Sequence, residues 1–578
     1  MKRLLGSIAL LASCACVVTG SELRETIERY DADRRAVSHP YRVCPTGRGS
    51  GSRHFGECFA EPSDARRTRL RTFYQESLDR LKAVDFDKLS QAGKVDYLLL
   101  QNQIRRELRR LDLEAKRLEE TAPYAPFAEA ILKLEDARRR VEPVDAAKAA
   151  AAVTAIGGQV AEVRKRFDEK HEAKALAVRA AGEVDKLRTM LGNWFAYYDG
   201  YDPLFTWWVE APFKETDKVL EDYAKFLREK VAGLKPDEVV GAPIGREALL
   251  SELAFEMVPY TPEELIDIAN KEAAWCEAEL KKAAREMGYG DDWKKALEQT
   301  KNHHVEPGRQ PALIHDLQQE AMEFIDKHNL ITVPPLARED WRIQMMSPER
   351  QLVNPFFTGG DDIDVSYPVD SMTQEQKLMS MRGNNVSFAR ATVFHELIPG
   401  HHLQGFMAER YLPYRHAFET PFFVEGWAVY WELTLWNLGY DQTPEQRIGA
   451  LFWRLHRCAR IVFSLSFHLG KMSPQECIDY LVDRVGHERA NAVAEVRRSV
   501  ATDYGPLYQA AYLLGALQLR ALRRELVESG KMSDREFNDA VLKENAIPIE
   551  MIRAALTGQK LGRDFQSSWR FYENGPAH

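Results

Sequence analysis

The chain has 578 residues, of which 45% are hydrophobic and 29% are charged, and its formal net charge is −8. This composition is ordinary for a soluble globular protein with a large core. The negative net charge provides no electrostatic footprint for a nucleic acid. We therefore expect no nucleic-acid partner.

Residues 1–20 have the features of a targeting segment. Two basic residues precede an apolar run that ends at Val18, and this run is too short to span a bilayer comfortably. Two processing sites compete: ordinary signal cleavage after Gly20, or lipidation of Cys14 in the lipobox-like sequence LASC. Both predict export, to the bacterial periplasm or as a membrane-anchored lipoprotein, with no membrane span in the mature chain.

Residues 21–62 form an N-terminal segment with little core of its own. Cys44 and Cys58 flank a loop rich in glycine and arginine, so we predict a disulfide that ties this segment down. Without Cys14 and Cys16, five cysteines remain, so at least one thiol stays free.

Hydrophobic periodicity predicts a mainly α body over residues 63–578. The predicted helices cover 64–120, 145–196, 214–233, 261–287 and 310–328, and helices resume from residue 377. The region 330–370 differs, because 330–333, 341–344 and 363–367 are typical of short strands. We therefore expect a small sheet immediately before the later helices.

The most informative motif begins at His395 and Glu396. In the zinc-peptidase motif HExxH, two histidines one helical turn apart bind one Zn²⁺, and the glutamate between them faces the attacking water. Here Pro399 occupies the position of the second histidine and cannot be a ligand. The next imidazoles belong to His401 and His402.

The choice between these two histidines depends on the helix around Pro399. On a straight helix His401 would point away from the face of His395, whereas His402 would return to that face about 10 Å further along. Proline lacks the N–H for the helical hydrogen bond and opens the preceding turn. If Pro399 and Gly400 form a bulge, His401 takes the position of the second histidine. We favour His401, with His402 as the alternative.

A second helix offers a third ligand. Thr420 is a good N-cap, and the helix that follows places Glu425 and Glu432 on one face among aromatic and aliphatic residues. Burial of two carboxylates there is costly without a cation or hydrogen-bond partners. A metal removes that cost for Glu425, and Glu432 can hold a ligating imidazole. The alternative is that one or both pair with arginines such as Arg454 or Arg457.

Three segments carry a family resemblance: HELIPGHHLQ (395–404), FVEGWAVYWE (423–432) and QAAYLLG (509–515). They resemble the bacterial domain-of-unknown-function family 885, a branch of the gluzincin metallopeptidases. FVEGWA also resembles the third-ligand helix of the thimet oligopeptidase and angiotensin-converting enzyme families. In those families the ligand glutamate follows the second histidine by about two dozen residues, and Glu425 follows His401 by 24, which favours His401.

The resemblance implies an elongated, mainly α gluzincin-like fold with a small sheet beside the active-site cleft. It places the catalytic helices at about 387–440 and 507–527. It implies one Zn²⁺ per chain, held by His395, His401 and Glu425, with Glu396 as the general base. His402 and Glu432 are then expected to lie around the ligands.

A late helix supplies the remaining candidates. Related helical peptidases use tyrosines from such a helix to donate a hydrogen bond to the oxyanion, and the match to QAxYxxG makes Tyr512 our choice, with Tyr508 in reserve. Arg498 is a candidate for binding a substrate carboxylate. The alternative is that Tyr508 and Tyr512 are ordinary core aromatics at i,i+4 spacing.

These features predict an exported zinc-dependent peptidase, acting on short peptides. One alternative is a zinc amidohydrolase that cleaves a non-peptide amide. Another is an inactive exported metal-binding protein, against which Glu396 argues, because a structural zinc site is usually closed by four protein ligands and needs no general base.

Overall fold

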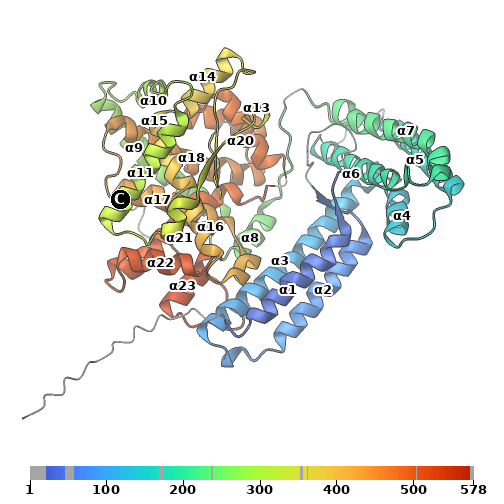
Figure 1. Ribbon diagram of the computed structural model, residues 1–578, viewed down its shortest axis with the longest axis horizontal. Coiled ribbons are helices and arrows are strands. Elements are labelled where there is room, and N and C mark those ends of the chain that lie inside the picture. Colours follow the sequence, from blue (N-terminus) through green and yellow to red (C-terminus); the bar gives the residue numbers. More distant parts are fainter. Residues whose placement is uncertain are drawn as a thin grey trace, which may run out of the picture.

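The computed structural model describes residues 21–45, 58–167, 174–235, 238–351, 356–360, 362–502 and 504–572. The predicted targeting segment, with Cys14, lies outside these residues. Figure 1 shows three parts: a group of long N-terminal helices, a helical lobe to one side, and a larger body that contains the C-terminal half. The prediction of a mainly α fold with little strand is confirmed.

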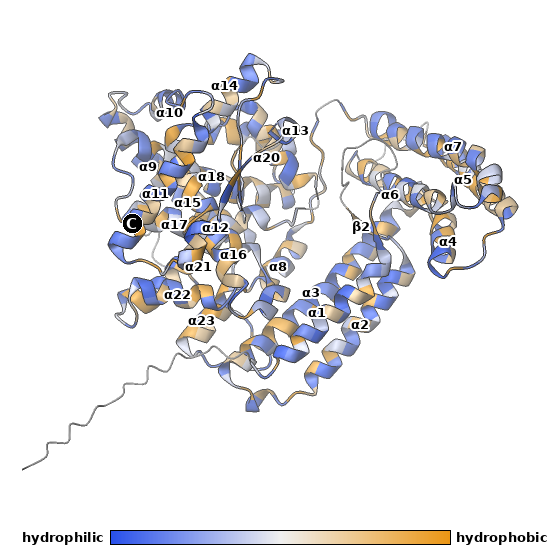
Figure 2. Cartoon of the chain, in the orientation of Figure 1, coloured by the Kyte–Doolittle hydropathy of each residue, from blue (hydrophilic) through white to orange (hydrophobic). Residues whose placement is uncertain are grey.

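The N-terminal helices are α1 (Arg24–Ser38), α2 (Asp64–Lys82) and α3 (Gln91–Thr121). They lie side by side in Figure 1, and much of their outer surface is hydrophilic in Figure 2. The almost unbroken helix expected over 64–120 is interrupted once, where a short 3-10 turn at Phe86–Lys88 lies between α2 and α3. The side chain of Ser90 accepts a hydrogen bond from the N–H of Gly93 and so begins a new helix.

The lobe is built from four helices: α4 (Ala128–Arg139), α5 (Ala146–Lys165), α6 (Lys174–Tyr198) and α7 (Pro203–Phe226). Their buried side chains form a core separate from that of the body. Beside it, β1 (Arg42–Val43) pairs antiparallel with β2 (Phe59–Ala60). Cys44 and Cys58 form a disulfide next to this pair. Residues 63–578, expected as one body, therefore contain two large cores.

The body holds the later helices: α8 (Arg246–Phe255), α9 (Pro262–Glu286), α10 (Trp293–Lys301), α11 (Gln310–His328), α12 (Pro335–Asp340), α13 (Pro348–Gln351), α14 (Gln374–Gly383), α15 (Val386–Glu396), α16 (His401–Ala408), α17 (Pro421–Asn437), α18 (Pro444–His468), α19 (Pro474–Tyr480), α20 (Arg489–Val500), α21 (Tyr508–Arg523), α22 (Asp534–Lys543) and α23 (Ile549–Thr557). The region predicted as catalytic helix over 387–440 is three helices, α15, α16 and α17. The later one, predicted over 507–527, is α21 with a π-helical turn after it.

The small sheet of the body contains two parallel strands, β3 (Arg342–Met345) and β4 (Asp362–Val365). The third strand predicted at 330–333 is wrong. Its backbone groups bond to side chains of α22 instead: the Leu330 carbonyl accepts from Asn538 at 2.9 Å, and the Thr332 N–H donates to Asp539 at 2.8 Å. The apolar face of β4 packs against α15, in a small core that includes Val393.

Helices α17 and α21 approach each other unusually closely. A Cβ atom added to Gly426 would lie 2.6 Å from the Cα of Gly515, and one added to Gly515 would lie 1.8 Å from the carbonyl oxygen of Phe422. Only glycine fits at either position, because real Cβ contacts are longer. This backbone-to-backbone packing brings the third-ligand helix against the helix that carries the candidate tyrosines.

Candidate metal centre

His395 and Glu396 form the last turn of α15, where the helix ends rather than bulging as predicted. The chain turns through Leu397–Gly400, and a new helix, α16, begins at His401. The turn removes the two extra residues from the helical register. The imidazole rings of His395 and His401 lie with their centroids 4.9 Å apart.

Distant side chains hold this turn in place. The carbonyl of Ile398 accepts from the side chain of Gln318 at 3.0 Å, and the carbonyl of Pro399 accepts from the indole N–H of Trp427 at 2.8 Å. The Gly400 N–H donates to the Phe394 carbonyl at 3.0 Å. Hydrogen bonds from α11, α15 and α17 therefore fix the position at which α16 begins with His401.

Glu425 projects from α17 toward both imidazoles. Its Oε2 lies 3.3 Å from Nε2 of His401 and 4.0 Å from Nε2 of His395. Its Oε1 accepts a hydrogen bond from the hydroxyl of Tyr508 at 2.6 Å. Oε2 is buried and has no hydrogen-bond partner among the described residues, an arrangement that is costly unless something else meets that oxygen.

The Nε2 atoms of His395 and His401 and the Oε2 atom of Glu425 fit the coordination of a zinc ion. Ligand atoms about 2.0–2.1 Å from a tetrahedral ion lie roughly 3.3 Å from one another, close to the separations seen here. One atom each of His395, Glu396 and His401 also lies within 4.8 Å of the others. Of the two glutamates Glu425 is the better candidate ligand, because its Oε2 lies 3.3 Å from Nε2 of His401 and 4.0 Å from Nε2 of His395, whereas Oε2 of Glu396 lies 4.0 Å from Nε2 of His401.

The electrostatics point the same way. Burial alone would lower the pKa of His401, but the facing carboxylate of Glu425, with the charge of Glu396, raises it above its ordinary value. Burial would raise the pKa of Glu425, yet the two imidazoles hold it well below its ordinary value. A buried carboxylate between two imidazoles therefore stabilises positive charge at the point where they meet.

Glu432, two helical turns after Glu425 on α17, supports His395. Its Oε1 accepts from Nδ1 of His395 at 2.7 Å and from the guanidinium of Arg457 at 3.1 Å. The sequence left a metal-supporting role and an arginine pair as alternatives for this carboxylate, and both contacts are present. Arg454 instead pairs with Glu272 on α9 at 2.7 Å.

His402 faces a different partner. Its Nε2 lies 3.0 Å from the carbonyl oxygen of Ala337 on α12, and its ring lies near Phe406. The contact seen is with α12, and the expectation that His402 lies around the ligands or touches substrate stays a prediction. His402 joins α16 to α12, because a residue adjacent to His401 on a helix points about 100° away from it.

The candidate tyrosines lie along α21 beside Glu425. The Tyr508 hydroxyl donates its hydrogen bond to Glu425 and so supports this carboxylate. Two guanidinium carbons lie near the ring centre of Tyr512, that of Arg457 at 4.9 Å and that of Arg460 at 4.3 Å. Burial, with the nearby charge of Glu425, raises the pKa of Tyr512 well above its ordinary value, so the hydroxyl keeps its proton.

Sequence reasoning missed the buried Glu495 on α20. It pairs with Arg460 at 2.6 Å and with Arg498 at 3.1 Å, and it accepts from Gln509 at 2.9 Å. Arg498, predicted as a substrate-carboxylate ligand, is thus already paired, although its side chain stays 37% exposed. The spacing of Glu495 and Arg498, i and i+3 on one helix, is the signal that could have revealed the pair.

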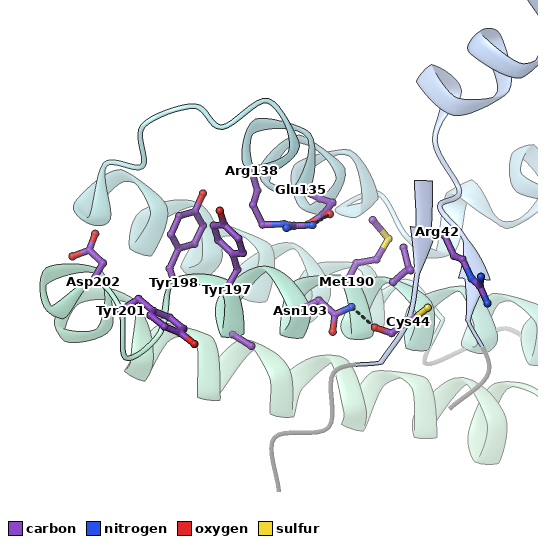
Figure 3. A pocket seen from close by; sticks show the side chains of 12 residues that line it. Arg42, Cys44, Glu135, Arg138, Met190, Asn193, Tyr197, Tyr198, Tyr201 and Asp202 are labelled. Carbon is purple, nitrogen blue, oxygen red and sulfur yellow. Dashed lines mark hydrogen bonds and ion pairs between the residues drawn. The ribbon is translucent and has the colours of Figure 1, made fainter. Parts of the chain in front are cut away.

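A cavity of about 810 Å³ lies in the helical lobe and not at the candidate centre (Figure 3). Its polar lining is engaged in contacts within the lobe: Arg138 pairs with Glu135 and lies 5.0 Å from the ring centre of Tyr197. Asn193 donates to the carbonyl of Cys44 at 2.9 Å. None of the predicted site residues lines this cavity.

Known structures share the fold. A "putative lipoprotein of unknown function" from Shewanella oneidensis is 18% identical, with a TM-score of 0.65 over 93% of this chain and 99% of its own. A structure described as "the putative lipoprotein" from Colwellia psychrerythraea is 15% identical, with a TM-score of 0.58 over 93% of this chain and 98% of its own. No curated protein matches the chain. The model of the family described as bacterial protein of unknown function (DUF885) matches residues 47–556, and the chain belongs to that family.

Proposed function

We propose that the protein is a zinc-dependent metallopeptidase that hydrolyses peptide bonds, with short peptides as its substrates. The observation that carries this proposal is the buried Oε2 of Glu425, which has no hydrogen-bond partner among the described residues and faces the Nε2 atoms of His395 and His401. Two imidazoles and a carboxylate are the ligands of many catalytic zinc sites, which keep a further position open. The small sheet against α15 agrees with a gluzincin-like arrangement.

In this proposal His395, His401 and Glu425 hold the metal. A bound Zn²⁺ would supply a Lewis acid that activates water and polarises the scissile carbonyl. Glu396 accepts the proton of the attacking water and returns it to the leaving amine. The position of its carboxylate supports this role: Glu396 lies in the last turn of α15, with its Oε2 4.0 Å from Nε2 of His401.

Two further side chains complete the proposed site. Tyr512 donates a hydrogen bond to the oxyanion that develops at the scissile carbonyl, for which its retained proton is required. Arg498 is partly exposed and offers the N–H groups not used by Glu495 to a substrate carboxylate.

We also propose that the protein is exported. The N-terminal sequence supports this, and so does the description of both structural relatives as lipoproteins. Among the described residues, no helix is long and apolar enough to cross a membrane. Mass spectrometry of the mature N-terminus distinguishes a lipid-modified Cys14 from a chain that begins at Ser21.

The function is tested with the full mature chain. Metal analysis is expected to give about one zinc per chain. Digestion of a peptide library is expected to be abolished by a chelator and restored by zinc. Glu396→Gln should keep the zinc and lower kcat by several orders of magnitude, since it removes the base but no ligand. Glu409→Gln, at an exposed carboxylate directly after α16, is the control.

Three results would count against the proposal. A Glu396→Gln variant with full activity would show that this pair is not catalytic. A zinc-loaded chain that leaves the library intact but cleaves other amides would make it an amidohydrolase. A zinc-loaded chain that cleaves neither would be a metal-binding protein without turnover.

A further inference from the structure

Arg457 lies on the buried helix α18 and faces the support of the metal centre. Its Nη2 donates to Oε1 of Glu432 at 3.1 Å, and the same oxygen accepts from Nδ1 of His395 at 2.7 Å. One carboxylate oxygen therefore joins the guanidinium to the imidazole. Arg457 and His395 are buried and the Glu432 side chain is only 9% exposed, so the relative positions of the three groups are strongly constrained.

The same guanidinium also contacts the candidate oxyanion donor. Its carbon lies 4.9 Å from the centre of the Tyr512 ring and 5.3 Å from that of Trp453. A cation within about 6 Å of an aromatic face is attracted by the ring, so Arg457 restrains the ring from which the Tyr512 hydroxyl projects. Its Nε has no hydrogen-bond partner among the described residues, so these contacts are its main ones.

We propose that Arg457 is a positioning residue that couples the imidazole of His395 to the ring of Tyr512. A single buried cation then sets both the direction of a metal ligand and the place of the oxyanion donor. This inference rests on the proposed function. It adds a link between two parts of the site that come from different helices, α15 and α21.

The chemistry of arginine suits this position. A planar guanidinium can donate in its plane to Glu432 while its face lies toward Tyr512, whereas the ammonium of lysine is a point charge without a face. An uncharged residue would leave Glu432 buried without a fixed cation, which destabilises the carboxylate that orients His395. Lysine and methionine at this position therefore remove different parts of the coupling.

The chain provides a matched control on the same helix. Arg454 is as deeply buried as Arg457 and pairs with Glu272 at 2.7 Å, and its guanidinium carbon lies 4.0 Å from the ring centre of Trp275. It is thus another buried arginine with one carboxylate and one aromatic partner. No contact of Arg454 with His395, Glu425 or Tyr512 occurs in the described part of the chain.

The experiment compares Arg457→Met, Arg457→Lys and Arg454→Met with wild type in three measurements: zinc affinity by chelator competition, kcat and KM at saturating zinc, and melting temperature. Arg457→Met should weaken zinc binding roughly 10- to 100-fold, as expected for the support of a ligand. At saturating zinc its kcat should still fall, by up to about tenfold, and its KM should be nearly unchanged.

Arg457→Lys keeps the charge beside Glu432, so it should retain most of the zinc affinity and lose mainly kcat. In the double variant with Tyr512→Phe, the loss in kcat should be smaller than the product of the single losses, because both changes disturb one hydroxyl. Arg454→Met should lower the melting temperature without affecting zinc affinity or kcat.

Two outcomes would overturn the inference. Arg457→Met with normal zinc affinity and kcat, and only a lower melting temperature, would make Arg457 a packing residue. Lost zinc affinity with normal kcat at saturating zinc would remove the link to Tyr512. If Arg457→Met does not fold, Arg457→Lys is the test. A lower kcat with retained zinc affinity supports the coupling, and a normal kcat contradicts it. A wild type that binds zinc but cleaves no amide refutes the function, yet the zinc affinities of Arg457→Met and Arg454→Met still test the link to His395.

Discussion

The turn between the two histidines depends on a residue that carries no side chain. A Cβ atom added to Gly400 would lie 1.8 Å from the carbonyl oxygen of His395 and 2.6 Å from that of Phe394. Both are backbone atoms, which cannot move aside by rotating a side chain. In Gly400→Ala, the start of α16 and the end of α15 must therefore separate by roughly 1 Å or more.

We expect Gly400→Ala to lower the free energy of unfolding by about 3 kcal/mol or more, the size of the larger single-site losses. Because the displaced carbonyl belongs to the ligand His395, zinc affinity should fall as well. A misplacement of about 1 Å at a reacting centre can cost roughly 100-fold in rate, so kcat should fall by at least that factor.

The control is Gly405→Ala in the interior of α16. A Cβ atom there meets nothing within 4 Å, so alanine should stabilise the helix by about 0.5–1 kcal/mol. Urea unfolding of the metal-free chains and zinc titration measure both effects. Equal stability and zinc affinity of the two variants would refute the claim that the Gly400 turn fixes the distance between His395 and His401.

Three further predictions concern the neighbouring groups. His401→Ala should abolish zinc binding in a calorimetric titration, whereas His402→Ala, which loses only a contact to α12, should retain most of it; the reverse ranking would show that His402 is the ligand. Tyr512→Phe should lower kcat about 100-fold with unchanged zinc affinity, and Tyr508→Phe should weaken zinc binding about tenfold through Glu425, a difference that kinetics and chelator competition resolve. Burial would raise the pKa of Glu495, but its arginine partners lower it to about 2 from 4.5. Between pH 2 and 4.5 the folded chain therefore binds fewer protons than the unfolded chain. The stability that Glu495 contributes is fully present above pH 4.5, and about 3 kcal/mol of it is lost as the pH falls toward 2. The free energy of urea unfolding should change less steeply with pH across that range in Glu495→Gln than in wild type.

The local sequence was sufficient for the parts of the site that lie within one helix. Thr420 caps α17 through its side chain, as predicted, and the spacing of Glu425 and Glu432 places both on the face toward α15. Such features depend on helical periodicity and capping, which act over a few residues.

The end of α15 could not be predicted in the same way. Pro399 indicated a disturbance, but it does not distinguish a bulge from a complete turn. The turn depends on Gln318 and Trp427, which are distant in sequence and bind the carbonyls of Ile398 and Pro399. The false strand at 330–333 has a similar origin, because its β-prone residues bond to side chains of α22 rather than to a strand.

The carboxylates around the centre differ in whether an arginine pairs with them, and this difference bears on the function of the centre. Glu432 has Arg457, and Glu495 has Arg460 and Arg498. Further away, the fully buried Glu272 and Asp96 are also paired with arginines.

Glu425 departs from this pattern. Among the described residues it has no arginine or lysine partner within ion-pair distance; it meets only a tyrosine hydroxyl and the two imidazoles. The chain supplies an arginine to Glu432 and Glu495 beside the centre but not to Glu425, which leaves a requirement for positive charge where the imidazole nitrogens converge. Protonation of one imidazole could supply that charge, but the protonated Nε2 would then have no lone pair left to bind a metal. A divalent metal ion satisfies the carboxylate and uses both lone pairs together, which is why we place zinc there.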